Sequence, residues 1–156
     1  MRSMGVIARS AVLACMAVGF AWADAHDDVM EVVTSMAGAL TEVSGIGPSV
    51  VRGNVSRFMS AFSKEMPDYA TLESNVTALV RQAEVSSSIQ TVSEDGDDQA
   101  RTIDLDWVLE VRSLEQDGPI VRRREVIHCE LRKEKKHWKI VALKPIDFFA
   151  PPKLGQ

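Results

Sequence analysis

Cysteine, histidine and ready-made catalytic motifs are scarce in this chain, and their scarcity excludes several classes of function. Among 156 residues there are two cysteines, Cys15 and Cys129, and three histidines, with no Cys-x-x-Cys or His-x-His spacing. A disulfide framework or a site of closely spaced metal ligands needs such patterns. The sequence also lacks a phosphate-binding loop, a Gly-x-Ser-x-Gly segment and a dinucleotide fingerprint. We therefore expect neither a metal nor a cofactor.

Positive charge is also in short supply. Lysine and arginine number 18 against 22 aspartates and glutamates, which gives a formal net charge of −4. Nucleic-acid binding draws on clustered excess positive charge, so we expect no nucleic-acid partner. The run Arg122–Arg124 does not change this, because successive residues of a strand point to opposite faces. The length fits one domain, and the apolar share of 46% is that of a globular protein.

Long apolar runs are absent after residue 22, and the run before it is short. The first ten residues carry Arg2 and Arg9 and no acid, and Ala11–Trp22 is then apolar or small throughout. Two small-x-small sites suited to signal peptidase end at Ala23 and Ala25. This is the pattern of a signal peptide. We expect residues 1–23 to be a signal peptide, cleavage after Ala23 or Ala25, and export to the periplasm or secretion.

Two alternative interpretations of this segment stay open. A bilayer-spanning helix needs about 20 apolar residues, which the run does not reach unless an uncleaved anchor starts further upstream. Val12–Cys15 weakly resembles a lipoprotein cleavage site. After signal cleavage we expect no stable membrane span, and Cys129 has no partner for an internal disulfide. The hydrophobic core alone must then hold the mature chain together.

Apolar residues recur at three- and four-residue steps in the next part of the chain, which predicts three amphipathic helices. The first is expected in residues 27–43, with acidic residues at its N-terminal end and glycines and Pro48 after it. The second ends at Met66–Pro67, and the third follows Asp68. Their apolar stripes are Val29, Val32, Val33, Met36, Leu40 and Val43; Val51, Val55, Phe58, Met59 and Phe62; and Leu72, Val76, Leu79, Val80 and Ala83.

After Glu84 the apolar period changes from about 3.6 to 2, which predicts strands. We expect strands in residues 85–93, 100–114, 119–133 and 137–143, joined by turns at 94–97, 116–118 and 134–136. The second strand is the clearest, with one apolar and one charged face. No internal repeat or long linker divides the chain. The prediction is one domain over residues 27–149, followed by a flexible, proline-rich tail at 150–156.

Matching of apolar faces predicts how these strands pair. A three-residue loop with Gly118 in a left-handed conformation gives the pairs Trp107–Ile127, Leu105–Cys129 and Ile103–Leu131. On the opposite face this register produces two complementary pairs, Asp106–His128 and Glu110–Arg124, and two like-charge pairs, Asp104–Glu130 and Arg112–Arg122. Charge therefore decides little. A loop around Glu134–Lys135 places Leu131 opposite Trp138, Cys129 opposite Ile140 and Glu130 opposite Lys139.

Three helices followed by a one-sided antiparallel meander resemble the nuclear transport factor 2-like superfamily, which includes ketosteroid isomerase, scytalone dehydratase and SnoaL-like cyclases. Phe58–Phe62, Met66–Tyr69 and the strand Lys136–Val141 look like family positions. The resemblance rests on pattern and order over about residues 27–149. It implies an α+β fold in which three N-terminal helices pack on the concave face of a strongly curved four-stranded antiparallel sheet, a cystatin-like cone with a pocket at its open end. It does not imply one function, because this fold hosts isomerases, dehydratases, transport adaptors and binding modules.

Side-chain direction tests whether such a cone carries chemistry, since a general base must come within hydrogen-bond reach of its substrate. Alternation points Asp104, Asp106 and His128 away from the helices. In the inward set, Arg123 and Glu125 are the ionisable residues. That set is Ile103, Leu105, Trp107, Leu109, Val111, Val121, Arg123, Glu125, Ile127, Cys129, Leu131, Trp138, Ile140 and Ala142. We therefore predict no catalytic residue.

Several inward or aromatic residues have a structural and a functional interpretation. Arg123 and Glu125 form an ion pair at the rim or recognise an acidic or amide ligand. Cys129 is expected to be a small buried residue rather than a nucleophile. Phe148 and Phe149 either fold back to plug one end of the cone or form an exposed patch for a partner.

The first hypothesis is a non-catalytic module that binds a small apolar or amphipathic ligand or another protein, with a homodimer through the outer sheet face as an option. Its pocket wall would consist of Tyr69, Trp107, Arg123, Glu125 and Trp138. The alternative is an isomerase- or dehydratase-like enzyme with Glu125 as base and Arg123 and Tyr69 orienting substrate. A third hypothesis is a structural envelope component that docks through Phe148–Phe149.

Overall fold

The computed structural model describes residues 18–41, 47–114 and 118–153, with side chains described from Ala23 onwards. Helices come first and strands second, as the change of period predicted. A short 3-10 helix, η1, follows the last strand. The elements are α1 (Val18–Thr41), α2 (Pro48–Met59), α3 (Tyr69–Gln82), β1 (Ala83–Gly96), β2 (Ala100–Ser113), β3 (Ile120–Glu134), β4 (His137–Lys144) and η1 (Ile146–Phe149).

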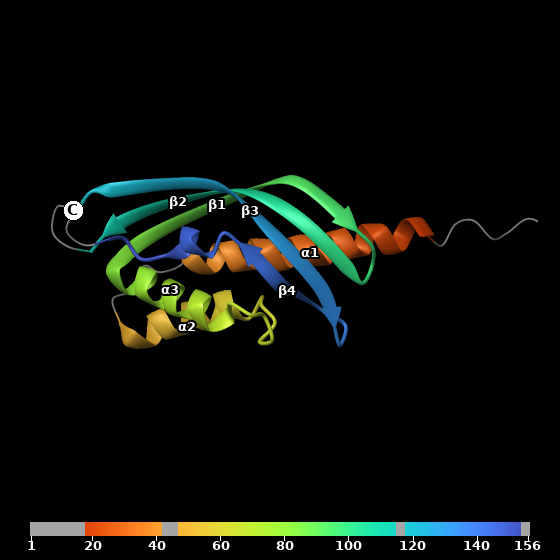
Figure 1. Cartoon of the computed structure of the whole chain (residues 1–156), viewed down its shortest axis with the longest axis horizontal. Helices are drawn as coiled ribbons and strands as arrows, with labels where there is room; N and C mark the ends of the chain where they lie inside the picture. Colours follow the sequence, from red (N-terminus) through yellow and green to blue (C-terminus); the bar gives the residue numbers. More distant parts are fainter. Residues whose placement is uncertain (1–17, 42–46, 115–117, 154–156) are drawn as a thin grey trace, which may run out of the picture.

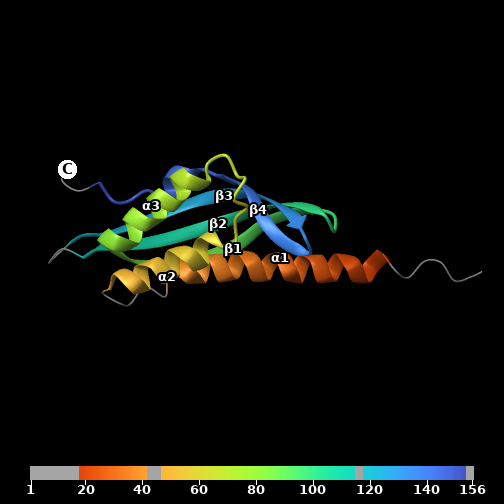
Figure 2. The ribbon, with the colours of Figure 1, turned by 90° about the horizontal axis from the view of Figure 1, so that it is seen from below.

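The four strands form one antiparallel sheet in the order β1-β2-β3-β4. Figure 1 shows this sheet arching over the three helices, and Figure 2 shows α1 running along its concave side with α2 and α3 next to it. The segment after α2 covers the free edge of β4, where the Ser63 amide donates to the Ile140 carbonyl at 2.9 Å. The predicted α+β class, with three helices on the concave face, is confirmed.

Helix α1 is longer than the periodicity predicted, since it begins at Val18 rather than Asp27. Its buried face carries the predicted Val29, Val33, Met36 and Leu40. Near its start, His26 Nδ1 lies 2.5 Å from Glu94 Oε2, and Glu94 in turn accepts from Arg101 Nε at 2.7 Å. Helix α1 is thus attached to the β1–β2 hairpin. Signal cleavage remains a prediction.

The predicted pairing of β2 with β3 is wrong by two residues. Trp107 lies opposite Glu125, Leu105 opposite Ile127 and Ile103 opposite Cys129. A shift of two residues leaves every side chain on its own face, so matching of apolar faces cannot distinguish the two registers. The observed register places Asp104 opposite His128 and Glu110 opposite Arg122, and the like-charge pairs expected from the sequence do not form. Charge pairing across the strands favours this register.

The predicted pairing of β3 with β4 is also wrong. Lys133 lies opposite Trp138 and Leu131 opposite Ile140, because the hairpin turns on two residues, Lys135 and Lys136, with φ of +46° and +74°. Turns of this kind favour Asn-Gly, so the sequence carried no signal for it. A register shift between Glu130 and Leu131 then reverses the faces along β4.

The reversal changes which residue of β4 enters the core. Leu143 is buried and Ala142, which alternation had placed inward, is half-buried. A bulge adds one residue to a strand and so breaks the two-residue period on which the prediction relied.

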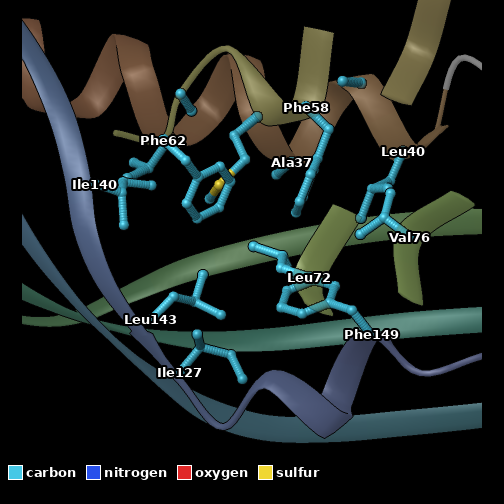
Figure 3. Close-up of a cluster of buried hydrophobic side chains, with 14 of the residues drawn as sticks. Ala37, Leu40, Phe58, Phe62, Leu72, Val76, Ile127, Ile140, Leu143 and Phe149 are labelled. Atoms are coloured by element: carbon cyan, nitrogen blue, oxygen red, sulfur yellow. The ribbon is translucent and has the colours of Figure 1, made fainter. Parts of the chain in front are cut away.

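Phe148 and Phe149 fold back into the core, as one of the two interpretations of the tail predicted. Phe149 is fully buried and Phe148 is 5% exposed. Figure 3 shows the Phe149 side chain reaching from η1 into the space between helices and sheet, close to Leu72. Its ring centroid lies 5.5 Å from that of Phe58 on α2 and 5.0 Å from that of Trp107 on β2. One residue near the C-terminus therefore contacts both layers of the fold.

Substitution of two different glycines by alanine is expected to change the stability in opposite directions. Gly96 has φ of +132°, and a Cβ there would lie 2.3 Å from the Ala100 carbonyl oxygen, whereas a Cβ on Gly53 in α2 meets nothing within 4 Å. We expect Gly96→Ala to lower the free energy of unfolding by about 1–3 kcal/mol, and Gly53→Ala to raise it by about 1 kcal/mol because alanine favours helix. Urea unfolding of both variants measures this. Equal effects of the same sign would contradict the described hairpin.

Candidate functional site

The concave interior around Trp107 is filled by the protein's own side chains. Trp107 is fully buried, and its Nε1 donates to Ser87 Oγ at 2.9 Å. The rings of Phe148 and Phe149 lie with their centroids 6.2 Å and 5.0 Å from that of Trp107. An indole whose N–H is already bonded and whose ring is covered by two phenylalanines is part of the core.

Arg123 holds the C-terminal segment in place. Its Nη1 donates to the Phe148 carbonyl oxygen at 2.9 Å and to the Ala150 carbonyl oxygen at 2.5 Å. Strand β4 ends at Lys144, opposite His128, so the preceding part of β3 has no neighbour in β4 and the C-terminal segment lies there instead. Burial lowers the pKa of Arg123 from its usual value. The guanidinium is thus half-buried and bonded to backbone.

Glu125 lies on the same inward face as Arg123 but is exposed. The ion pair between Arg123 and Glu125 that the sequence suggested does not form, since the Arg123 bonds go to carbonyl groups. Val121, also expected inward, is 43% exposed. Alternation gave the correct face for these residues. It did not show that the helices and β4 leave this end of β3 partly uncovered.

The carboxylates that look catalytic in the sequence lie on the outer face of the sheet. Asp104 Oδ1 lies 2.6 Å from His128 Nδ1, and Asp104 Oδ2 accepts from Ser93 Oγ at 2.8 Å. These bonds, that of His128 first, lower the pKa of Asp104. Asp106 accepts from Arg124, which likewise lowers its pKa. Asp104, Asp106 and His128 alternate with buried residues of β2 and β3, so they face away from the helices, and Arg124 bonds Asp106 on that same face.

A hollow lies outside the cone, between α2, α3 and the β3–β4 hairpin. Its volume is about 1170 Å³, and it is open to solvent. We call it the helix groove. Its walls are Val51, Arg52, Val55, Ser56, Met59, Ser60, Phe62, Ser63, Lys64, Glu65, Tyr69, Glu73, Thr77, Arg81, Glu134, Lys135, His137 and Lys139.

Tyr69 stands at the start of α3 in the wall of the helix groove. It is half-buried, and burial, followed by the charge of Glu73, raises its pKa above the usual value. The phenol therefore stays protonated at neutral pH and offers one hydroxyl. Among the five residues predicted as a pocket wall, Tyr69 is the one that lines this groove.

Trp138 borders a second, smaller hollow of about 340 Å³ between α1, α2 and β4. Its side chain is 4% exposed, and its Nε1 has no hydrogen-bond partner within the part of the chain that the structure describes. Lys133 Nζ lies 5.9 Å from the centre of the Trp138 ring. Trp138 is therefore mainly a core residue beside this hollow.

The five predicted residues do not meet in one pocket wall. Tyr69 and Trp138 border different hollows, and Trp107, Arg123 and Glu125 line neither. A role of any of them in ligand binding stays a prediction. Burial raises the pKa of Cys129 to about 12, which keeps the thiol protonated and agrees with a structural role.

Sequence analysis missed two kinds of charged residue. Arg101 is 4% exposed and paired with Glu94, although alternation from Ile103 already points it inward. The cations of the helix groove come from separate elements: Arg52 from α2, Arg81 from α3, and the others from the loop after α2 and the β3–β4 hairpin. In the sequence, isolated charges of this kind usually mean only a solvated surface. Within the described ranges no group of three or more possible metal ligands converges, and no helix is long and apolar enough to cross a membrane.

The role of Arg123 is open to test by hydrogen exchange. We expect Arg123→Met, which keeps an apolar stem but loses both bonds, to speed amide exchange in residues 146–150 by about 10- to 100-fold, because hydrogen bonds from charged groups contribute about 1.5–3 kcal/mol. Arg124→Met is the matched control, since Arg124 is 65% exposed and bonds Asp106 on the other face. Unchanged exchange in Arg123→Met would show that the C-terminal segment does not depend on this residue.

Comparisons with known proteins give likeness in fold without close likeness in sequence. No family model matches the chain, and no curated protein matches its sequence. A protein from Novosphingobium aromaticivorans with a provisional description as an aromatic ring hydroxylase is similar over 78% of this chain and 87% of its own, at 12% identity and a TM-score of 0.60. A nuclear transport factor 2-like superfamily protein from Salmonella enterica is similar over 86% and 96%, at 10% identity and a TM-score of 0.58.

A protein of unknown function from Nostoc punctiforme, described as having a cystatin-like fold, is similar over 76% of this chain and 86% of its own, at 11% identity and a TM-score of 0.51. Identities this low concern the fold alone. Together with the three helices on one face of a four-stranded meander, they establish that this chain has the cone fold of nuclear transport factor 2-like proteins.

Proposed function

We propose that this chain is an exported nuclear transport factor 2-like domain that works as a non-catalytic binding module. The observation that carries the proposal is the filled interior. Trp107, Phe148 and Phe149 occupy the space in which a cone of this kind would hold a substrate. Binding surfaces then have to lie outside the cone, and the structure offers the helix groove and the outer sheet face.

The enzyme hypothesis needs Glu125, Arg123 and Tyr69 around one substrate. Glu125 is exposed, Arg123 bonds backbone carbonyls, and Tyr69 lines the helix groove, in whose wall neither of the other two occurs. A general base must come within hydrogen-bond reach of the proton that it removes from a bound substrate. Glu125 is exposed and lines neither hollow, so the geometry gives it no bound substrate to reach.

Export is the second part of the proposal, and it rests on the N-terminal sequence pattern. Of the two predicted cleavage positions, we favour the one after Ala23. Ala25 is 3% exposed and belongs to the core, so cleavage after Ala25 would remove a packed side chain, whereas Ala23 and Asp24 are exposed. Cleavage after Ala23 leaves His26 in α1, beside Glu94.

A homodimer through the outer sheet face is the third part. Val126 is 52% exposed on that face, between the pairs Asp106–Arg124 and Asp104–His128. Because these charges are paired within one sheet, a second copy can cover them without leaving an unpaired buried charge.

Native mass spectrometry of the tagged full chain, purified from its own host, tests export and assembly together. We expect the mass of a chain that begins at Asp24, present as a dimer that Val126→Arg converts to a monomer. A mass that includes residue 1 would contradict export. A wild-type monomer at micromolar concentration would contradict the dimer.

The absence of turnover is tested with metabolite extract from the same host. Wild type and Glu125→Gln are incubated with the extract and followed by liquid chromatography with mass detection, with Glu110→Gln as the matched control because Glu110 is an exposed acid on the outer face. We expect the same time courses for all three proteins. A compound that wild type and Glu110→Gln consume and Glu125→Gln spares would overturn the proposal in favour of an enzyme.

A further inference from the structure

We propose that the helix groove binds an acidic amphipathic helix of a partner protein. The inference rests on the proposed function, because it identifies the partner class of the binding module. Three observations carry it: the shape of the groove, its apolar floor and the charges at its two ends.

The shape suits a helix better than a small molecule. Pockets for small ligands measure about 300–1000 Å³ and enclose most of the ligand, whereas this groove has about 1170 Å³ and is open to solvent. Its long walls are α2 and α3, which Figure 2 shows next to each other over the sheet. Helix α2 has 12 residues, which corresponds to about 18 Å. A partner helix of three to four turns matches that length.

The floor of the groove is apolar. On α2, the residues Val51, Val55 and Met59 recur at four-residue steps, and Phe62 follows them. On α3, the stripe that faces the groove begins with Tyr69 and continues with Glu73, Thr77 and Arg81, again at steps of four. The apolar stripe of α2 thus forms the floor, and the mostly polar stripe of α3 forms the facing wall. An apolar strip bordered by a polar wall is the kind of surface into which an amphipathic helix places its residues i, i+3, i+4 and i+7.

The charge of the groove is opposite to that of the whole protein. Its walls contain five lysines and arginines against three glutamates, although the chain carries a net charge of −4. Helices α2 and α3 run in opposite directions, so Arg52 and Arg81 lie at one end of the groove and Lys64, Lys135 and Lys139 at the other. The acidic residues of the groove walls are Glu65, Glu73 and Glu134.

Most of these cations have no partner of their own. Arg52, Lys64, Arg81 and Lys135 form no ion pair with any residue that the structure describes, and Lys139 donates to the Ser60 carbonyl oxygen. Elsewhere on the molecule, Arg101 and Arg124 are paired with carboxylates. Unpaired positive charge at both ends of an apolar groove is complementary to a helix with acidic first and last turns.

Fluorescence anisotropy with a labelled model peptide tests the inference. The probe is a 16-residue helix with leucines along one face and glutamates in its first and last turns. We expect the full chain to bind it, with an affinity that falls as salt is added. The triple variant Arg52→Gln, Lys64→Gln and Arg81→Gln should weaken binding at least tenfold. The matched control Arg112→Gln, Arg122→Gln and Lys153→Gln, with the same net charge, should stay within twofold of wild type.

The other occupants of the groove are outcomes of the same experiment. The peptide with lysine in place of each glutamate should not bind. If it binds equally well, or if the control triple variant weakens binding as much as the groove variant, the inference is wrong. Dodecanoate and unlabelled peptide are compared as competitors of the labelled peptide. If dodecanoate displaces the labelled peptide at a far lower concentration than the unlabelled peptide does, the groove is assigned to a small carboxylate instead. Peptide binding that weakens as the protein concentration rises, in the wild type and in Val126→Arg alike, would assign the groove to a second copy.

Failure here and failure of the proposed function give different results. If no peptide binds and no metabolite is turned over, the helix groove is not the binding surface, but the binding module stands. If metabolite turnover depends on Glu125, the proposed function falls, whatever the peptide does. Circular dichroism of each variant shows that a loss of binding is not a loss of fold.

Discussion

The contact of Phe149 with Phe58 and Trp107 connects every layer of this protein. Phe58 belongs to α2, Trp107 to the middle of the sheet and Phe149 to the segment after the last strand. The ring centroid of Phe149 lies 5.5 Å from that of Phe58 and 5.0 Å from that of Trp107. Buried aromatic side chains each remove roughly 150–250 Å² from water. Because Cys129, the cysteine among the described residues, forms no disulfide, such burial is the main source of the stability of this fold.

This contact also decides what the inside of the cone can do. A ring that closes the interior leaves the residues beyond it exposed to solvent, and Glu125 is one of them. Arg123 meanwhile bonds the carbonyls of the segment that carries the ring. Of the two inward ionisable residues that the sequence offered for chemistry, Arg123 thus holds the C-terminal segment in place and Glu125 is an exposed acid. This arrangement is what supports the proposal that the function lies in interaction surfaces on the outside of the fold.

The sequence was sufficient for the architecture but insufficient for the registers. Apolar periods of 3.6 and 2 depend on which side of an element is buried, and the core residues of α2, α3 and β2 lie where these periods placed them. A register depends on loop length and on charge pairs across strands. The turn at Lys135 and Lys136 has no glycine or asparagine to reveal it, and the shift between Glu130 and Leu131 leaves no trace in the residue pattern.

The same distinction explains why the helix groove was not predicted. A groove forms where two helices diverge, and divergence depends on the angle at which α2 and α3 pack on the sheet, which periodicity does not encode. In the sequence, Arg52, Lys64 and Arg81 are ordinary surface charges, and Lys135 is one residue of a basic turn. The fold brings them to one apolar strip and leaves them without counter-ions among the described residues. A net negative protein that concentrates unpaired positive charge at the ends of one groove has the electrostatics of a binding surface, since complementary charge both steers a partner and fixes its orientation.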